Sequence, residues 1–117
     1  MTPRLYGIRN CDTVKRALAW FEERGIAVEF VDYKKTPPSR SLLDGWLRRV
    51  DHGRLVNRAG TTWRKLPDDA RAAAETTAGA LALMIEKPSV IRRPVIETDG
   101  TLLVGYDPDL YAKTFHG

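Results

Sequence analysis

The sequence predicts an α/β fold in which a β-α-β segment is followed by helices and then by a β-β-α segment, with the strands in one mixed sheet. Three observations predict it. A short apolar segment at residues 5–8 precedes an amphipathic run that begins at Thr13. Residues 39–87 carry helical patterns and loops, with no strand pattern. Asp99-Gly100 then separates two apolar stretches, which is typical of a β-hairpin because both central positions of a type I′ turn need a positive φ.

The first third of the chain predicts the β-α-β unit. After the strand at residues 5–8, apolar residues recur at the i, i+3, i+4, i+7 spacing of a helix that ends at Gly25. Residues 28–31 predict the second strand. Cys11 therefore lies at the carboxyl end of the first strand, which is the edge where open α/β sheets bind ligands.

The middle of the chain predicts only helices and loops. Ser39 offers a helix cap, and apolar residues at helical spacing predict a helix over residues 42–50. A polar loop over residues 57–64 leads to an alanine-rich helical region at about 68–86, either one helix or two pieces split near Glu75.

The last part of the chain predicts the hairpin strands at residues 95–97 and 101–104, followed by a helix capped by Asp107. The whole order is the thioredoxin topology with an all-helical insertion at about residues 39–87. No internal repeat or linker argues for two domains, so we expect residues 1–117 to form a single thioredoxin-like domain.

Composition narrows the classes of function. The chain has 43% hydrophobic residues, enough for a core, and no apolar run of the roughly 18 to 20 residues that a membrane span needs. The N-terminus lacks the apolar core of a signal peptide, so we expect a cytoplasmic protein without membrane contact. The net charge of +4 favours anionic ligands, but the basic residues are scattered, which argues against nucleic acid as a partner.

Cys11 is the single cysteine and the strongest candidate for chemistry. A thiol at a helix N-terminus is favoured as the thiolate by the free N–H groups and the helix dipole, and Arg9 and Lys15 act in the same direction. Asp12 opposes them unless it caps the helix. A redox or nucleophilic role is therefore predicted, against the alternative that Cys11 is a small buried apolar residue.

Other candidates have a structural alternative beside the functional one. The only histidines, His52 and His116, look solvated, and no spacing predicts a zinc site or another metal site. The loop at residues 60–63 could shape a substrate entrance or could serve packing alone. The aromatic residues of the helical stripes are predicted to be core: Trp20, Phe21 and Trp46.

Four segments, taken together and in order, resemble the arsenate reductase (ArsC) family, within its Spx/YffB-like branch. They are residues 6–13 with Cys11, residues 32–35, residues 57–66, and residues 87–95 with Arg92-Arg93-Pro94. The resemblance covers nearly the full length and implies a thioredoxin-like fold with a helical insertion. It also implies that Cys11 is the nucleophile, that Arg93 with Pro94 shapes an anion site, and that Pro94 is cis.

The family's arsenate reductases hold arsenate with several arginines, and glutathione with glutaredoxin completes the reduction. In this sequence Arg93 matches one arginine, whereas a second position is Gly105 and the third falls near Asn57, with Arg58 one residue away. Each missing charge-assisted hydrogen bond should cost about 1.5 to 3 kcal/mol. Arsenate reductase is therefore kept as an alternative.

The Spx-type regulators of the family carry a Cys-x-x-Cys switch and bind RNA polymerase, whereas here the second position is Val14. An internal dithiol switch is impossible, and a regulator that docks on RNA polymerase without catalysis is the second alternative. The likeness to YffB-like proteins implies a thiol reductase with glutathione as co-substrate and no bound cofactor, acting on an oxidised thiol substrate or with glutaredoxin. Arg93, Arg9, Lys15 and Arg58 are the candidates for binding its carboxylates.

Overall fold

Residues 2–115 are described by the structure, a computed structural model, in which the two ends of the chain form one unit and the middle forms another. The first unit consists of the chain up to Lys34 and from Arg93 onward, and the second consists of residues 35–92. In the part of the chain that the structure describes, every helix is too short or too polar to cross a membrane.

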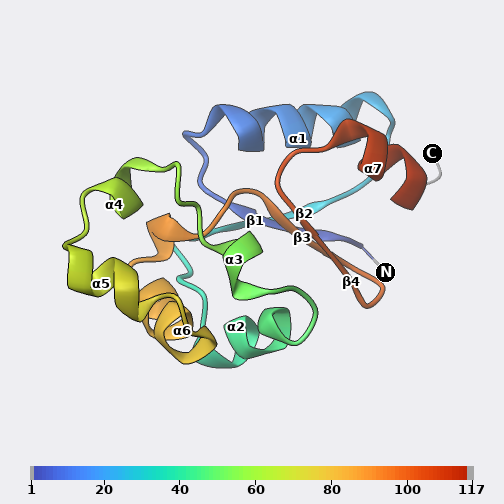
Figure 1. The fold of residues 1–117 in the computed structure, drawn as a ribbon. Helices are drawn as coiled ribbons and strands as arrows, with labels where there is room; N and C mark the ends of the chain where they lie inside the picture. The colour runs from blue at the N-terminus through green and yellow to red at the C-terminus, as the bar shows by residue number, and fades with distance from the viewer. Residues whose placement is uncertain (1, 116–117) are drawn as a thin grey trace. The chain divides into compact units, whose positions relative to one another are not determined.

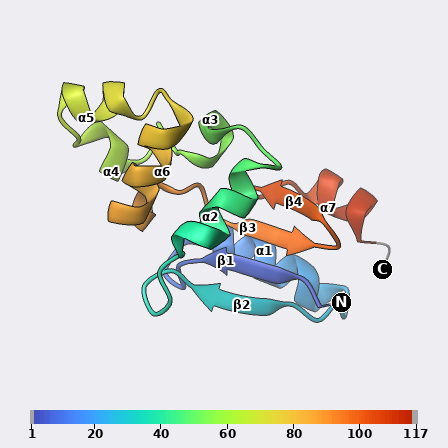
Figure 2. The ribbon, with the colours of Figure 1, turned by 90° about the horizontal axis from the view of Figure 1, so that it is seen from below.

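The first unit is built on a four-stranded mixed sheet (Figure 2). Its strands, in the spatial order β2-β1-β3-β4, are β2 (Glu29–Asp32), β1 (Arg4–Gly7), β3 (Val95–Thr98) and β4 (Thr101–Val104). The β1 and β2 strands are parallel, as the β-α-β pattern predicts, whereas β1 pairs with β3 and β3 pairs with β4 in antiparallel fashion. The predicted α/β class with thioredoxin-like topology is confirmed.

Two helices, α1 (Asp12–Glu23) and α7 (Pro108–Thr114), cover one face of this sheet (Figure 1). They bury an apolar cluster against it: Leu5, Val14, Ala17, Trp20, Phe21, Ile96, Leu103 and Tyr111. Trp20 meets Phe21 and Tyr111 edge to face, with ring centroids 5.1 and 5.4 Å apart, and Phe21 stacks on Tyr111. Burying each large apolar side chain contributes about 1.5 to 3 kcal/mol, so this cluster fixes α1, and with it Cys11, on the sheet.

The turn residues behave as their chemistry predicts. Asp99 and Gly100 have φ of 42° and 80°, the positive values that the β3–β4 hairpin turn requires. Asp107 caps α7, since its carboxylate accepts the N–H of Leu110 at 3.1 Å. Gly25, with φ of 66°, follows the end of α1.

The second unit contains five α-helices and a 3-10 helix. They are α2 (Arg40–Leu47), α3 (His52–Leu55), α4 (Thr61–Arg64), α5 (Asp68–Ala73), α6 (Thr77–Glu86) and η1 (Pro88–Val90). Ser39 caps α2, as predicted, and of the two alternatives for the alanine-rich region the structure has two helices divided close to Glu75. The buried side chain of Trp46 confirms its predicted place in the core.

Three details of the second unit differ from the sequence-based predictions. The helix predicted over residues 42–50 ends at Leu47, and part of the predicted polar loop is the short helix α4. The unit is also not helix and loop alone, because Val56 and Ile91 form an antiparallel bridge. The N–H of Asn57 donates to the carbonyl oxygen of Val90 at 2.8 Å beside it.

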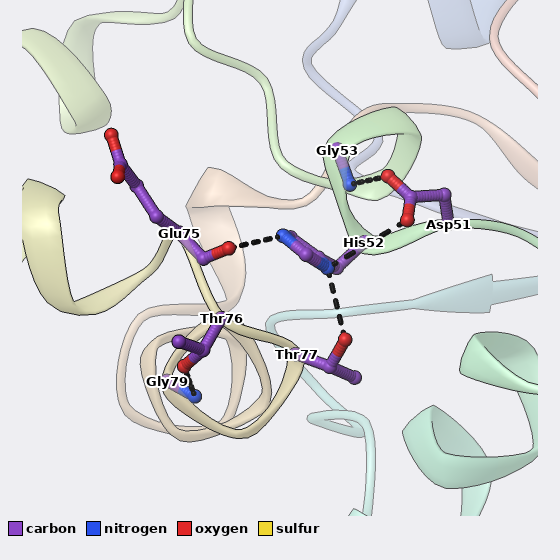
Figure 3. Close-up of polar contacts among 7 residues, drawn as sticks. All are labelled: Asp51, His52, Gly53, Glu75, Thr76, Thr77 and Gly79. Atoms are coloured by element: carbon purple, nitrogen blue, oxygen red, sulfur yellow. Dashed lines mark hydrogen bonds and ion pairs between the residues drawn. The ribbon is translucent and has the colours of Figure 1, made fainter.

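The prediction that His52 is solvated is wrong. Its side chain is only 16% exposed, and both ring nitrogens have partners (Figure 3). The Nε2 atom lies 3.0 Å from the carbonyl oxygen of Glu75 and must donate to it, because a carbonyl only accepts. The Nδ1 atom lies 3.1 Å from the Thr77 hydroxyl. His52 thus joins α3 to the start of α6, and His116 lies outside the described residues.

Candidate functional site

Cys11 occupies the N-cap position of α1, four residues after β1 ends at Gly7. Its backbone is extended, with φ of −143° and ψ of 122°, and its carbonyl oxygen accepts the N–H of Lys15 at 2.9 Å. The local sequence explains this position, because the amphipathic stripe of α1 begins at Val14 and buries against the sheet. The sulfur is therefore held at the positive end of a helix that cannot slide.

The groups around the sulfur favour its thiolate form. Burial by itself would raise the pKa of Cys11, but the N–H of Val14, the guanidinium of Arg93 and the N–H of Thr13 oppose it. The charge of Arg93 adds to their effect, and the pKa of the thiol lies below its ordinary value. The Thr13 and Val14 N–H groups lie in the first turn of α1, where helix N–H groups have no intrahelical partner and the helix dipole is positive.

Arg93 is brought to Cys11 by the segment that precedes β3. The Arg93–Pro94 peptide bond is cis, as expected, and Pro94 is buried. The carbonyl oxygen of Pro94 accepts the N–H of Gly105 at 2.8 Å, so the segments before β3 and after β4 are tied together. Arg93, far along the chain, thereby comes close enough to the sulfur of Cys11 to lower the pKa of the thiol.

Arg9, Lys15 and Asp12 lie near Cys11 in the sequence, but the structure gives them other roles. The guanidinium of Arg9 lies 5.0 Å from the ring centroid of Phe30, a cation–π arrangement on β2. Lys15 and Asp12 are exposed residues of α1. Among the described residues, those that act on the thiol are Val14, Thr13 and Arg93, so the prediction that Arg9 and Lys15 favour the thiolate finds no support in the contacts.

The model of the ArsC family matches residues 6–114. The chain belongs to the ArsC family. An uncharacterised protein of Haemophilus influenzae is 35% identical to this chain over 111 residues. The match covers 95% of this chain and 96% of the length of that protein.

Two solved structures are similar over almost the whole length. The protein named YFFB is 44% identical, with a TM-score of 0.91. The match covers 96% of this chain and 97% of that protein. An arsenate reductase (ArsC) related protein of Brucella melitensis is 47% identical, with a TM-score of 0.79. The match covers 97% of this chain and 93% of that protein. The thioredoxin-like fold that the sequence predicts is thus shared with these two solved structures.

Two of the positions discussed for the ArsC anion site have a defined environment. Gly105 has φ of 88°, a conformation that an arginine there would adopt only under strain. Arg58 belongs to the second unit, where its guanidinium lies 5.4 Å from the ring centroid of Trp63. That contact supports a packing role for Trp63 in the loop at residues 60–63, and a role of Arg58 in binding carboxylates stays a proposal.

Sequence reasoning missed two tyrosines of this ArsC chain, Tyr6 in β1 and Tyr33 directly after β2. The rings of Tyr6 and Tyr33 are stacked, with centroids 6.5 Å apart, and the Tyr6 hydroxyl donates to the Glu97 carboxylate at 2.6 Å. The Tyr33 hydroxyl is buried and has no hydrogen-bond partner among the described residues. Burial raises the pKa of Tyr33, while the charge of Arg93 acts in the opposite direction. The segment at residues 32–35 carried the family resemblance, but nothing in it signalled a buried hydroxyl near Arg93.

Proposed function

We propose that this protein is a monothiol oxidoreductase that uses Cys11 to reduce disulfides, in particular mixed disulfides of glutathione. One observation carries the proposal: the Cys11 sulfur lies at the N-terminus of α1 beside Arg93, with its pKa below the ordinary value. Only the thiolate attacks a disulfide, so this environment increases the reactive fraction at neutral pH.

The reaction has two balanced exchanges. In the first, the Cys11 thiolate attacks the glutathione sulfur of a mixed disulfide, the S–S bond breaks, and the substrate leaves as a thiolate that takes a proton from water. In the second, a glutathione thiolate attacks the Cys11–glutathione disulfide. Glutathione disulfide is released and the Cys11 thiolate is regenerated. The net reaction converts one mixed disulfide and one glutathione into a free thiol and glutathione disulfide.

The need for an external thiol follows from the sequence. Cys11 is the only cysteine, so no residue of the chain can resolve the mixed disulfide. Glutathione carries two carboxylates, for which Arg93 and, as further candidates of the same unit, Arg9 and Lys15 are suitable ligands. Glutaredoxin or another oxidised thiol is the partner class, and the cytoplasm, where thiols are kept reduced, is the compartment.

The test is turnover of a glutathionylated peptide with glutathione as reductant. The wild-type protein should form glutathione disulfide catalytically, and Cys11→Ser should form none while keeping the circular dichroism spectrum and melting temperature of the wild type. A Cys11→Ser variant with wild-type turnover, or a wild-type protein without turnover, would contradict the proposal.

Two alternative functions are separated by parallel assays. Arsenate reduction with glutathione and glutaredoxin would support an arsenate reductase, which Gly105 disfavours because it supplies no guanidinium. Binding to RNA polymerase that persists in Cys11→Ser would support a regulator without catalysis. We expect neither, because Gly105 disfavours arsenate and because docking does not need the lowered pKa of Cys11.

A further inference from the structure

Gly7, the last residue of β1, has a close neighbour that a larger residue would not tolerate. A Cβ atom added at Gly7 would lie 2.6 Å from Cγ2 of Val14 in the first turn of α1. Carbon atoms in favourable contact are about 3.5 to 4.0 Å apart, so one of the two segments would have to move by roughly 1 Å.

Gly7 is held in place by the sheet. Its carbonyl oxygen accepts the N–H of Tyr33 at 2.8 Å, and it pairs with Asp32 of the parallel strand β2. A substitution that pushed Gly7 away from α1 would have to break this end of the β1–β2 ladder.

Val14 has little freedom to turn aside. Its side chain is fully buried in the cluster that contains Leu5 and Ala17, and a β-branched side chain in a helix has one strongly preferred rotamer. The segment that yields is therefore the first turn of α1, which carries the N–H groups of Thr13 and Val14 that act on Cys11.

We propose that the missing side chain of Gly7 is a positioning device for the thiol: it lets the first turn of α1 close onto the end of β1 and so sets the Thr13 and Val14 N–H groups against the Cys11 sulfur. This inference rests on the proposed function only in taking Cys11 as the nucleophile. Gly7 is a positioning residue and does not touch the substrate.

The test is the rate of alkylation of Cys11 against pH in Gly7→Ala, Val14→Ala and the double variant, followed by intact mass. Gly7→Ala should move the midpoint of the rate profile toward that of the urea-unfolded chain and slow alkylation at neutral pH by about threefold to tenfold, since one pKa unit is a tenfold change in the ionised fraction. The double variant removes Cγ2 and should return the midpoint to that of Val14→Ala.

A matched control is Gly45→Ala in α2, because a Cβ there meets no atom within 4 Å. It should leave the profile unchanged. The charged groups near the thiol, Arg93 with Arg9, Asp12 and Lys15, are present in every variant, so a shift of the midpoint reports the displacement of the first turn of α1 and not a lost charge. A variant that lost stability but stayed folded, as checked by circular dichroism, would keep the wild-type midpoint.

An unchanged midpoint in Gly7→Ala, or a double variant as slow as Gly7→Ala, would overturn the inference. If Gly7→Ala fails to fold, the double variant decides: a midpoint equal to that of Val14→Ala supports the inference, and failure to fold or a shifted midpoint overturns it. Wild-type turnover of the glutathionylated peptide is scored separately. Its absence would refute the proposed function while leaving the alkylation result intact.

Discussion

The hydroxyl of Tyr111 donates a hydrogen bond to the carbonyl oxygen of Gly105 at 2.6 Å. Tyr111 is fully buried in α7, and the N–H of Gly105 donates in turn to the carbonyl oxygen of Pro94. A single glycine after β4 thus links the last helix to the segment that presents Arg93.

Replacing Tyr111 with Phe should lower the free energy of unfolding by about 1 to 3 kcal/mol, because it leaves the carbonyl oxygen of Gly105 without this donor. Urea unfolding measures the change. Tyr106→Phe is the control, since its ring also contacts Tyr111 and reports any change of aromatic packing. Equal stability of Tyr111→Phe and the wild type would show that the hydrogen bond contributes nothing.

Replacing Arg93 with Gln should raise the pKa of the Cys11 thiol, because it removes a nearby positive charge that favours the thiolate. The measurement is alkylation rate against pH. Arg92→Gln is the neighbouring control, because the Nε of Arg92 donates to the carbonyl oxygen of Arg54 in the second unit. A thiol pKa that is the same in Arg93→Gln and Arg92→Gln would mean that Arg93 does not act on the sulfur.

Replacing Tyr33 with Phe should raise the free energy of unfolding by about 1 kcal/mol, because a buried hydroxyl without a partner is a cost that the phenyl ring does not carry. The stacking on Tyr6 is kept. Tyr6→Phe makes the opposite comparison, since it removes a hydroxyl that is bonded to Glu97 and should destabilise the protein. A loss of stability in Tyr33→Phe would refute this prediction.

Alkaline pH should destabilise the protein through its buried tyrosines. Burial, and then the hydrogen bond to Glu97, raises the pKa of Tyr6 to about 12 from 10.0. Burial also raises the pKa values of Tyr33 and Tyr111. Because these groups bind their protons more tightly when folded, their contribution is complete below about pH 10 and, for Tyr6, is lost as the pH rises through about 12.

Urea unfolding at stepped alkaline pH, with tyrosinate absorbance followed in parallel, measures this loss. Tyr6→Phe should lose less stability over the same interval than the wild type. A wild-type stability that stays level up to pH 12 would contradict the prediction.

Local chemistry explains why most elements could be predicted. Val14 and Phe21 belong to an apolar stripe that defines a helix, Asp99-Gly100 accepts positive φ, and Ser39 supplies a side-chain cap. Each of these signals lies within a few residues of the structure that it specifies. The position of Cys11 at a helix N-terminus follows from the same stripe.

What could not be predicted depends on residues that are distant in the chain. The four-residue helices α3 and α4 are too short to show a periodic stripe, although Asp51 does cap α3. His52 finds its partners at Glu75 and Thr77, and no local pattern announces that pairing. The contact of Gly7 with Val14 and the burial of the Tyr33 hydroxyl likewise arise only when the strands and helix pack.

The pairing of β1 with β3 joins Arg4 to Glu97, near opposite ends of the chain, and it is this pairing that carries Arg93 to Cys11. A ribosome therefore completes Cys11 and α1 long before it reaches the arginine. Contacts so distant in sequence also form late in folding, since the intervening loop must close first. On an unfinished chain Cys11 lacks its guanidinium partner, so the fraction of its thiol that is ionised stays lower until the last strands join the sheet.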